Sequence, residues 1–127
     1  MDENLNVSVG QRSDTIYLPT DHEMTLTFVD NGTDNANFNY KITDPMPYDG
    51  YFYYKAGNTK VTSSNAYAAH IVVQINYNGK TMDFRTPLNY NCSTIQFPIR
   101  KGTYITLVRV SKCGATSLST SICKLYY

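Results

Sequence analysis

The sequence predicts an all-β fold, a two-sheet antiparallel β-sandwich or jelly roll formed by one domain. The dominant hydrophobic period along the chain is two, and turn signals recur about every ten residues. No window keeps apolar residues at helical spacing without a glycine, a proline or a β-branched cluster interrupting it. With 127 residues, the chain is long enough for one buried core and too short for two. About eight or nine short strands of this kind fill two packed sheets.

Residues 1–20 stand apart from the sandwich domain, which we place at residues 21–127. The stretch is polar except for a few aliphatic side chains, so we expect an N-terminal arm or an edge strand that serves as an attachment segment. It lacks the basic and apolar regions of a secretory signal. No stretch approaches the roughly 18 apolar residues of a membrane span, and we expect no membrane insertion.

Two runs of alternating apolar residues open the domain, at 23–29 ("EMTLTFV") and 37–43 ("NFNYKIT"). Such alternation is typical of half-buried strands. The side chains expected to face the core are Met24, Leu26, Phe28, Phe38, Tyr40 and Ile42. Because an Asn-Gly pair lies in the connection between the runs, we predict that they pair antiparallel as a hairpin.

The segment "DPMPYDGYFYYKAG" combines rigid and aromatic residues. Pro45 and Pro47 are expected to hold the chain extended, and Asp49 and Gly50 to form a turn. The strand Tyr51–Tyr54 follows with large rings on both of its faces. Such a strand needs a second surface to cover it besides the core.

The longest predicted strand is 67–77. Asn78-Gly79 follows it as the clearest two-residue turn signal in the chain, since both residues of that turn need positive φ. The next strand, 81–85, is expected to bring Met82 and Phe84 to the same core. The remaining predicted strands are 94–99, 103–110 and 117–127.

The strand "TYITLVRV" is also expected to be apolar on both sides, with Ile105 and Leu107 on one and Tyr104, Val108 and Val110 on the other. One sandwich of this size cannot bury both sides of several strands. Self-association through one sheet is therefore expected. The alternative is that the tyrosine rings stay half-exposed at little cost, because their hydroxyl ends tolerate water.

The composition argues against nucleic acid and against catalysis. The net charge is +1, which provides no field to gather phosphates. His22 and His70 are more simply surface or interface residues than catalytic bases. Asp30 and Asp34 lie in an Asn/Gly-rich turn without the spacing of a calcium loop. In the absence of a nucleophile elbow or a phosphate loop, we expect no enzyme activity, no catalytic residues and no cofactor.

The three cysteines, Cys92, Cys113 and Cys123, do not form a secreted-type disulfide framework. Three packed thiols are the simplest interpretation, with one bridge as the alternative. No Cys-x-x-Cys or His-x-x-x-His spacing occurs, so no metal site is predicted.

Four features follow one another from Pro45 to Tyr127: a Pro-x-Asp-Gly turn before an aromatic strand, the hairpin "QINYNGK", the segment "FPIRKGTYITL" and a last strand ending in aromatics. Together they resemble the trimeric head domain at the tip of many bacteriophage fibre proteins. That architecture is similar to the jelly rolls of the tumour-necrosis-factor and complement type. The matching framework positions are Asp49, Gly50, Asn78, Gly79, Phe97, Pro98, Lys101 and Gly102.

The resemblance implies a homotrimer in a virion, assembled in the bacterial cytoplasm. Because the chain carries no stalk of repeats, a capsid-attached head fibre is favoured over a tail fibre, with a capsid or fibre-anchor protein as partner. Host contact would be with a surface glycan or an envelope protein. We expect the loops 56–65 and 86–93 to lie away from the attachment end, but the sequence identifies no binding residue. A monomeric carbohydrate-binding module or bacterial adhesin is the alternative.

Overall fold

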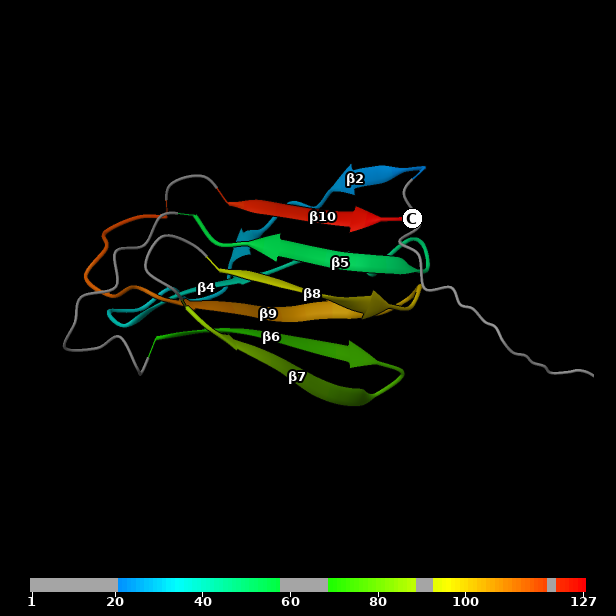
Figure 1. Ribbon diagram of the computed structural model, residues 1–127. Coiled ribbons are helices and arrows are strands. Elements are labelled where there is room, and N and C mark those ends of the chain that lie inside the picture. The colour runs from blue at the N-terminus through cyan, green and yellow to red at the C-terminus, as the bar shows by residue number, and fades with distance from the viewer. Residues whose placement is uncertain (1–20, 58–68, 89–92, 119–120) are drawn as a thin grey trace, which may run out of the picture.

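The computed structural model describes residues 21–57, 69–88, 93–118 and 121–127; the predicted arm at 1–20 lies outside them. Within the described residues there is no helix, and two antiparallel sheets pack against each other (Figure 1), so the predicted β-sandwich is confirmed. The strands are β2 (Glu23–Thr25), β3 (Val29–Asp30), β4 (Asn37–Lys41), β5 (Gly50–Lys55), β6 (His70–Tyr77), β7 (Lys80–Pro87), β8 (Thr94–Ile99), β9 (Tyr104–Ser111) and β10 (Ile122–Tyr126).

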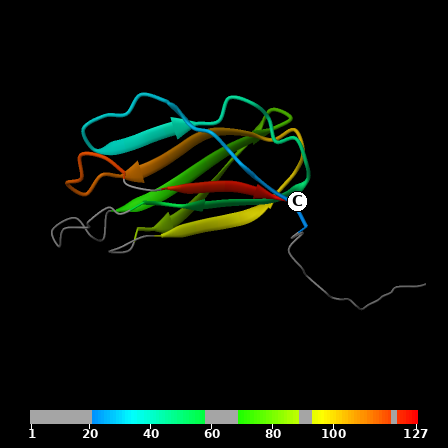
Figure 2. The same cartoon turned by 90° about the horizontal axis from the view of Figure 1, so that it is seen from above.

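One sheet has four strands in the order β2-β10-β5-β8, and the other has five in the order β3-β4-β9-β6-β7. Figure 2 shows them as two layers, with β10 and β8 (red and yellow) in one and β4 and β9 (cyan and orange) in the other. The pairings are nested: β6 pairs with β7, β5 with β8, β4 with β9 and β2 with β10. The chain is therefore one long hairpin wrapped across two sheets, which is the jelly-roll arrangement.

The innermost turn of this long hairpin is Asn78-Gly79, as predicted. Both residues have positive φ, 53° for Asn78 and 82° for Gly79. These values suit a type I′ turn, whose twist matches that of the flanking strands. Tyr77 and Lys80 are register partners on either side of the turn.

The predicted hairpin between 23–29 and 37–43 is only partly correct. The first run divides between the two sheets: β2 pairs with β10, and only the short β3 pairs with β4. Leu26 explains the division, because its side chain is buried in the core between the sheets while its backbone N–H donates to the Cys123 carbonyl at 2.9 Å. The chain thus crosses between the layers with its apolar side chains still facing inward.

The prediction for "TYITLVRV" assigns its residues to the two sides wrongly, because Leu107 and Tyr104 both lie outside the core. Ile105, Val108 and Val110 are all fully buried in the same core. A β-bulge between β6 and β9 makes Thr106 an extra residue, which moves the alternation of β9 by one position. The Thr106 hydroxyl donates to the backbone carbonyl of Gln74 at 3.1 Å. Of the two strands predicted to be apolar on both sides, β5 is the one that keeps large rings on both faces.

Aromatic rings fill one part of the core. The Phe97 ring stacks on Phe84 with centroids 3.9 Å apart and contacts Phe52 at 5.2 Å. The prediction that Phe84 faces the core is thus confirmed, but the same prediction for Met82 is wrong, since 57% of it is exposed. β7 is an edge strand, and Phe84 is the residue of this strand on which the Phe97 ring stacks.

Two of the three cysteines fall within the described residues, and both carry free thiols. Cys123 is buried in the core, and Cys113 is half-buried with a φ of 49°. Burial raises the pKa of both thiols. Cys92 lies outside the described residues.

Alkaline pH is expected to destabilise the domain through Cys123. Burial raises the pKa of this thiol to about 12, whereas an unfolded cysteine titrates near about 8.5. Between these values the unfolded chain releases the proton and the folded chain keeps it. Stability is therefore lost as pH rises through this window, by up to about 1.4 kcal/mol per pH unit. Urea unfolding between about pH 8 and pH 10 measures the slope.

Cys123→Ala should flatten this slope, and Cys113→Ala should leave most of it, because the Cys113 thiol is less buried. An unchanged slope in Cys123→Ala would show that other groups cause the alkaline loss. Tyr54 is one such group near the upper end of the range, since burial also raises the pKa of its hydroxyl.

Candidate functional site

The outward side of the four-stranded sheet is the candidate site, and we call it the tyrosine face. In β5, Phe52 and Tyr54 are fully buried, while Tyr51 and Tyr53 lie on the other side and are half-buried. The prediction that this strand carries rings on both faces is confirmed. The outward residues of the sheet are Glu23, Thr25, Tyr51, Tyr53, Lys55, Thr94, Gln96, Pro98, Ile122, Lys124 and Tyr126.

Three tyrosines lie together at the centre of the tyrosine face. Tyr51 and Tyr126 are direct register partners on neighbouring strands. The rings of Tyr53 and Tyr126 meet edge to face, with centroids 5.9 Å apart and planes at 87°. Ile122 adds an aliphatic side chain that is 37% exposed. The arrangement offers ring surface and phenol hydroxyls side by side, a combination that is common at protein interfaces.

A charged pair borders these rings. The Lys124 ammonium group donates to Glu23 Oε2 at 2.9 Å across β10 and β2, and this hydrogen bond raises the pKa of Lys124. Lys124 is also the register partner of Tyr53. Exposed pairs of this kind contribute little to stability but fix where charge lies on a surface.

The outward side of the five-stranded sheet differs, because a polar network covers part of it. Asn39 of β4 is buried, and its Oδ1 accepts a hydrogen bond from Arg109 Nε at 3.0 Å. Its amide nitrogen donates to the Gly32 carbonyl at 3.1 Å. The tyrosine face is therefore the more aromatic of the two outer surfaces.

The two carboxylates of that network, Asp30 and Asp34, accept hydrogen bonds within the local turn. Backbone and hydroxyl donors of Thr33 lower the pKa of Asp30. The backbone N–H groups of Ala36 and Asn37, both 2.8 Å from Asp34 Oδ1, lower the pKa of Asp34.

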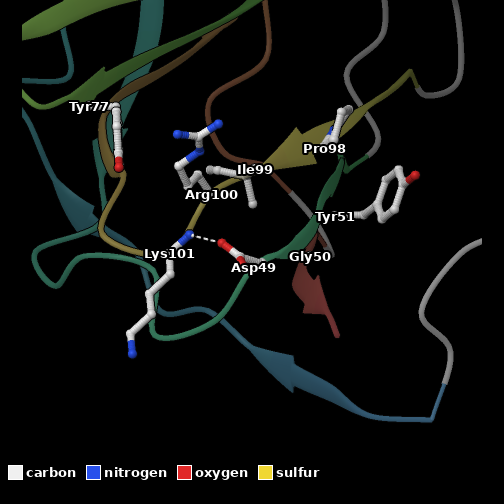
Figure 3. Close-up of a pocket in the computed structure, with 8 residues that line it drawn as sticks. All are labelled: Asp49, Gly50, Tyr51, Tyr77, Pro98, Ile99, Arg100 and Lys101. Carbon is white, nitrogen blue, oxygen red and sulfur yellow. Dashed lines mark hydrogen bonds between the residues drawn. The ribbon is translucent and has the colours of Figure 1, made fainter.

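An open hollow of about 960 Å³ lies at one end of the tyrosine face (Figure 3). We call it the Asp49 hollow. Its lining residues are Asp49, Gly50, Tyr51, Tyr77, Pro98, Ile99, Arg100 and Lys101. The Arg100 guanidinium lies over the Tyr77 ring, 5.3 Å from its centroid. The hollow thus combines two tyrosines and two cationic side chains with one carboxylate.

Hydrogen bonds join the two loops that border the hollow. Asp49 Oδ1 accepts from the backbone N–H of Lys101 at 2.8 Å. Next to it, the Met46 N–H donates to the Thr103 carbonyl, and the Gly102 N–H to the Met46 carbonyl, both at 2.8 Å. Two framework positions matched by resemblance, Asp49 and Lys101, are therefore in direct contact.

Asp49→Ala is expected to lower the free energy of unfolding by about 1 kcal/mol, because it removes the acceptor of the Lys101 N–H. Asp49→Asn keeps an acceptor oxygen and should lose less. Urea unfolding of the two variants measures the difference. An equal loss in both would show that the charge matters and the acceptor does not.

The two histidines lie at opposite ends of the sandwich, each with its own neighbours. The His22 ring stacks on Tyr127 at 5.3 Å, and Tyr127 stacks on Tyr48 at 4.1 Å. His70 Nδ1 lies 3.4 Å from the Ser111 hydroxyl. In the described part of the chain, no three His, Cys, Asp or Glu side chains gather as metal ligands. Nor does that part contain a helix of the length and apolarity needed to cross a membrane.

The loops 56–65 and 86–93, expected to lie away from the attachment end, have their ends at the end of the sandwich away from His22. The Ala56 N–H donates to the Ser93 carbonyl at 2.9 Å, and the Leu88 N–H to the Ala69 carbonyl at 3.4 Å. β5 finishes and β8 begins at this end, whereas β2 begins and β10 finishes at the other (Figure 1). Residues 58–65 and 89–92 of these loops lie outside the described residues.

Sequence reasoning missed the Asp49 hollow. Tyr77 ends β6 and Arg100 follows β8, and no local pattern indicates that they meet. The Asp-Gly and Lys-Gly signals mark the two loops but not the space between them. No protein family, curated protein or solved structure matches the chain.

Proposed function

We propose that the chain is the head domain of a bacteriophage virion appendage, which forms a homotrimer through the tyrosine face. The observation that carries the proposal is the cluster of Tyr51, Tyr53 and Tyr126 on the outer side of one sheet. The domain acts by binding and not by catalysis. A capsid-attached head fibre is favoured over a tail fibre.

Burial of the cluster provides the driving force for assembly. Tyrosine rings bury apolar area and keep a polar hydroxyl, and tyrosine is enriched at protein interfaces. A closed ring of three copies would cover all equivalent faces at once, which leaves no face for open-ended association. The jelly-roll order of the strands and the sequence resemblance to fibre heads support the same assembly.

The two ends of the sandwich then have separate roles. The attachment segment would join the domain at residue 21, at the end where β2 begins and β10 finishes, and would meet a capsid or fibre-anchor protein. The opposite end, near Ala56 and Ser93, would face the host surface, a glycan or an envelope protein.

Light scattering of the purified full chain tests the assembly. The expected mass is three times the 14.4 kDa of one chain. Antibody labelling of purified virions in the electron microscope tests the location, with label expected on the capsid. A monomer at all concentrations, or virions without label, would contradict the proposal.

The Asp49 hollow favours a second candidate, a monomeric carbohydrate-binding module or adhesin. Tyr51 and Tyr77 offer ring faces for a sugar, and Arg100 and Asp49 offer polar contacts. Selective binding on a glycan array by a chain that light scattering shows to be monomeric would favour this function.

A further inference from the structure

The two edges of the four-stranded sheet differ in charge. At the β2 edge lie Asp21, Glu23 and Asp44, all exposed. Asp44 belongs here because it lines a smaller hollow together with Met24 and Thr25 of β2. At the β8 edge lie Arg100 and Lys101, also exposed and part of the Asp49 hollow.

Asp21 and Arg100 lie beyond the same end of the four-stranded sheet. The register joins Glu23 of β2 to Pro98 of β8 in one row, through a tyrosine on each middle strand. Since β2 and β8 are antiparallel, Asp21 before Glu23 and Arg100 after Pro98 extend toward the same end.

We propose that the β2 edge of one copy docks against the Asp49 hollow of the next copy, so that Asp21 and Asp44 face Arg100 and Lys101. This inference rests on the trimer of the proposed function. In a cyclic assembly, the interface is heterologous and brings one edge of each copy to the other edge of its neighbour. If the threefold axis runs along the strands, rotation about it does not shift residues along the strands. The acidic β2 edge of one copy therefore meets the basic β8 edge of the next at the same level.

The groups around the hollow leave its cations available to a neighbour. The only carboxylate in the lining, Asp49, accepts a hydrogen bond from the backbone of Lys101. The Lys101 side chain extends away from the other lining residues in Figure 3. On the acidic side, Glu23 is held by Lys124, so Asp21 and Asp44 carry the attraction.

Charge reversal with rescue tests the docking. Two double variants each place like charges at every interface: Arg100→Glu/Lys101→Glu and Asp21→Lys/Asp44→Lys. Each should raise the trimer dissociation constant at least about tenfold at low salt. One chain with all four changes restores opposite charges and should return to within about threefold of wild type. Lys41→Glu/Arg85→Glu, on the five-stranded sheet, is the matched control and should change little.

Sedimentation equilibrium at two salt concentrations gives the constants, and circular dichroism verifies that each variant folds. Weakening by both reversals with recovery in the combined chain would support the docking. Two outcomes would overturn this inference alone, provided that the wild-type chain is a trimer. In one, the charge reversals leave the dissociation constant unchanged; in the other, the chain with all four changes does not recover the wild-type constant. A monomeric wild-type chain would overturn the trimer itself and this inference with it.

Discussion

Replacing Gly50 with alanine is expected to lower the free energy of unfolding by about 3 kcal/mol. A Cβ at this position would overlap the backbone carbonyl oxygen of Tyr126 and also press on Leu125, with its Cδ1 3.3 Å away. The overlapped atom is backbone, so no side-chain rotation can relieve the clash. β5 and β10 would have to separate, which weakens a pairing that spans five register partners.

Urea unfolding followed by circular dichroism measures the loss. Gly32→Ala is the matched control, because Gly32 has a φ of 83° but open space around its Cβ position. That variant should lose only about 1 kcal/mol, the typical cost of placing alanine in a left-handed conformation. If the two variants lost the same amount, close approach at Gly50 would not be the cause.

Gly50 also shows what a sequence pattern can and cannot predict. The predicted turn at Asp49-Gly50 is only partly correct: the backbone bends at residues 47–49, where local turn chemistry acts, but Gly50 is already the first residue of β5. The reason for the glycine is not local, since it depends on Tyr126 at the other end of the chain. Asn78-Gly79 is the opposite case: both positive φ values belong to the turn itself and were predictable from two letters.

The tyrosine face, like the Asn78-Gly79 turn, could be predicted because the pattern that forms it is local in the sequence. Strict alternation through β5 separates buried from outward rings, and no irregularity interrupts it. In β9 the same reasoning fails, because Thr106 adds a residue that only the pairing with β6 reveals. Alternation predicts a face reliably only where both strands of a ladder advance together.

Tyr51→Glu/Tyr53→Glu is expected to convert the proposed trimer to a monomer, with a dissociation constant raised at least about 100-fold. The two carboxylates would sit at the centre of the proposed interface, where each would lose water without gaining a partner. Folding should survive, because both side chains are only half-buried and point away from the core. Light scattering over a dilution series measures the change.

Tyr104→Glu is the control, since Tyr104 is also a tyrosine in a strand but belongs to the five-stranded sheet and is 44% exposed. Its substitution should leave the trimer intact. If Tyr104→Glu separated the copies and Tyr51→Glu/Tyr53→Glu did not, the interface would lie on the opposite sheet. The tyrosines of β5 would then be half-exposed rings whose hydroxyls simply tolerate water, and the main argument for a fibre head would be lost.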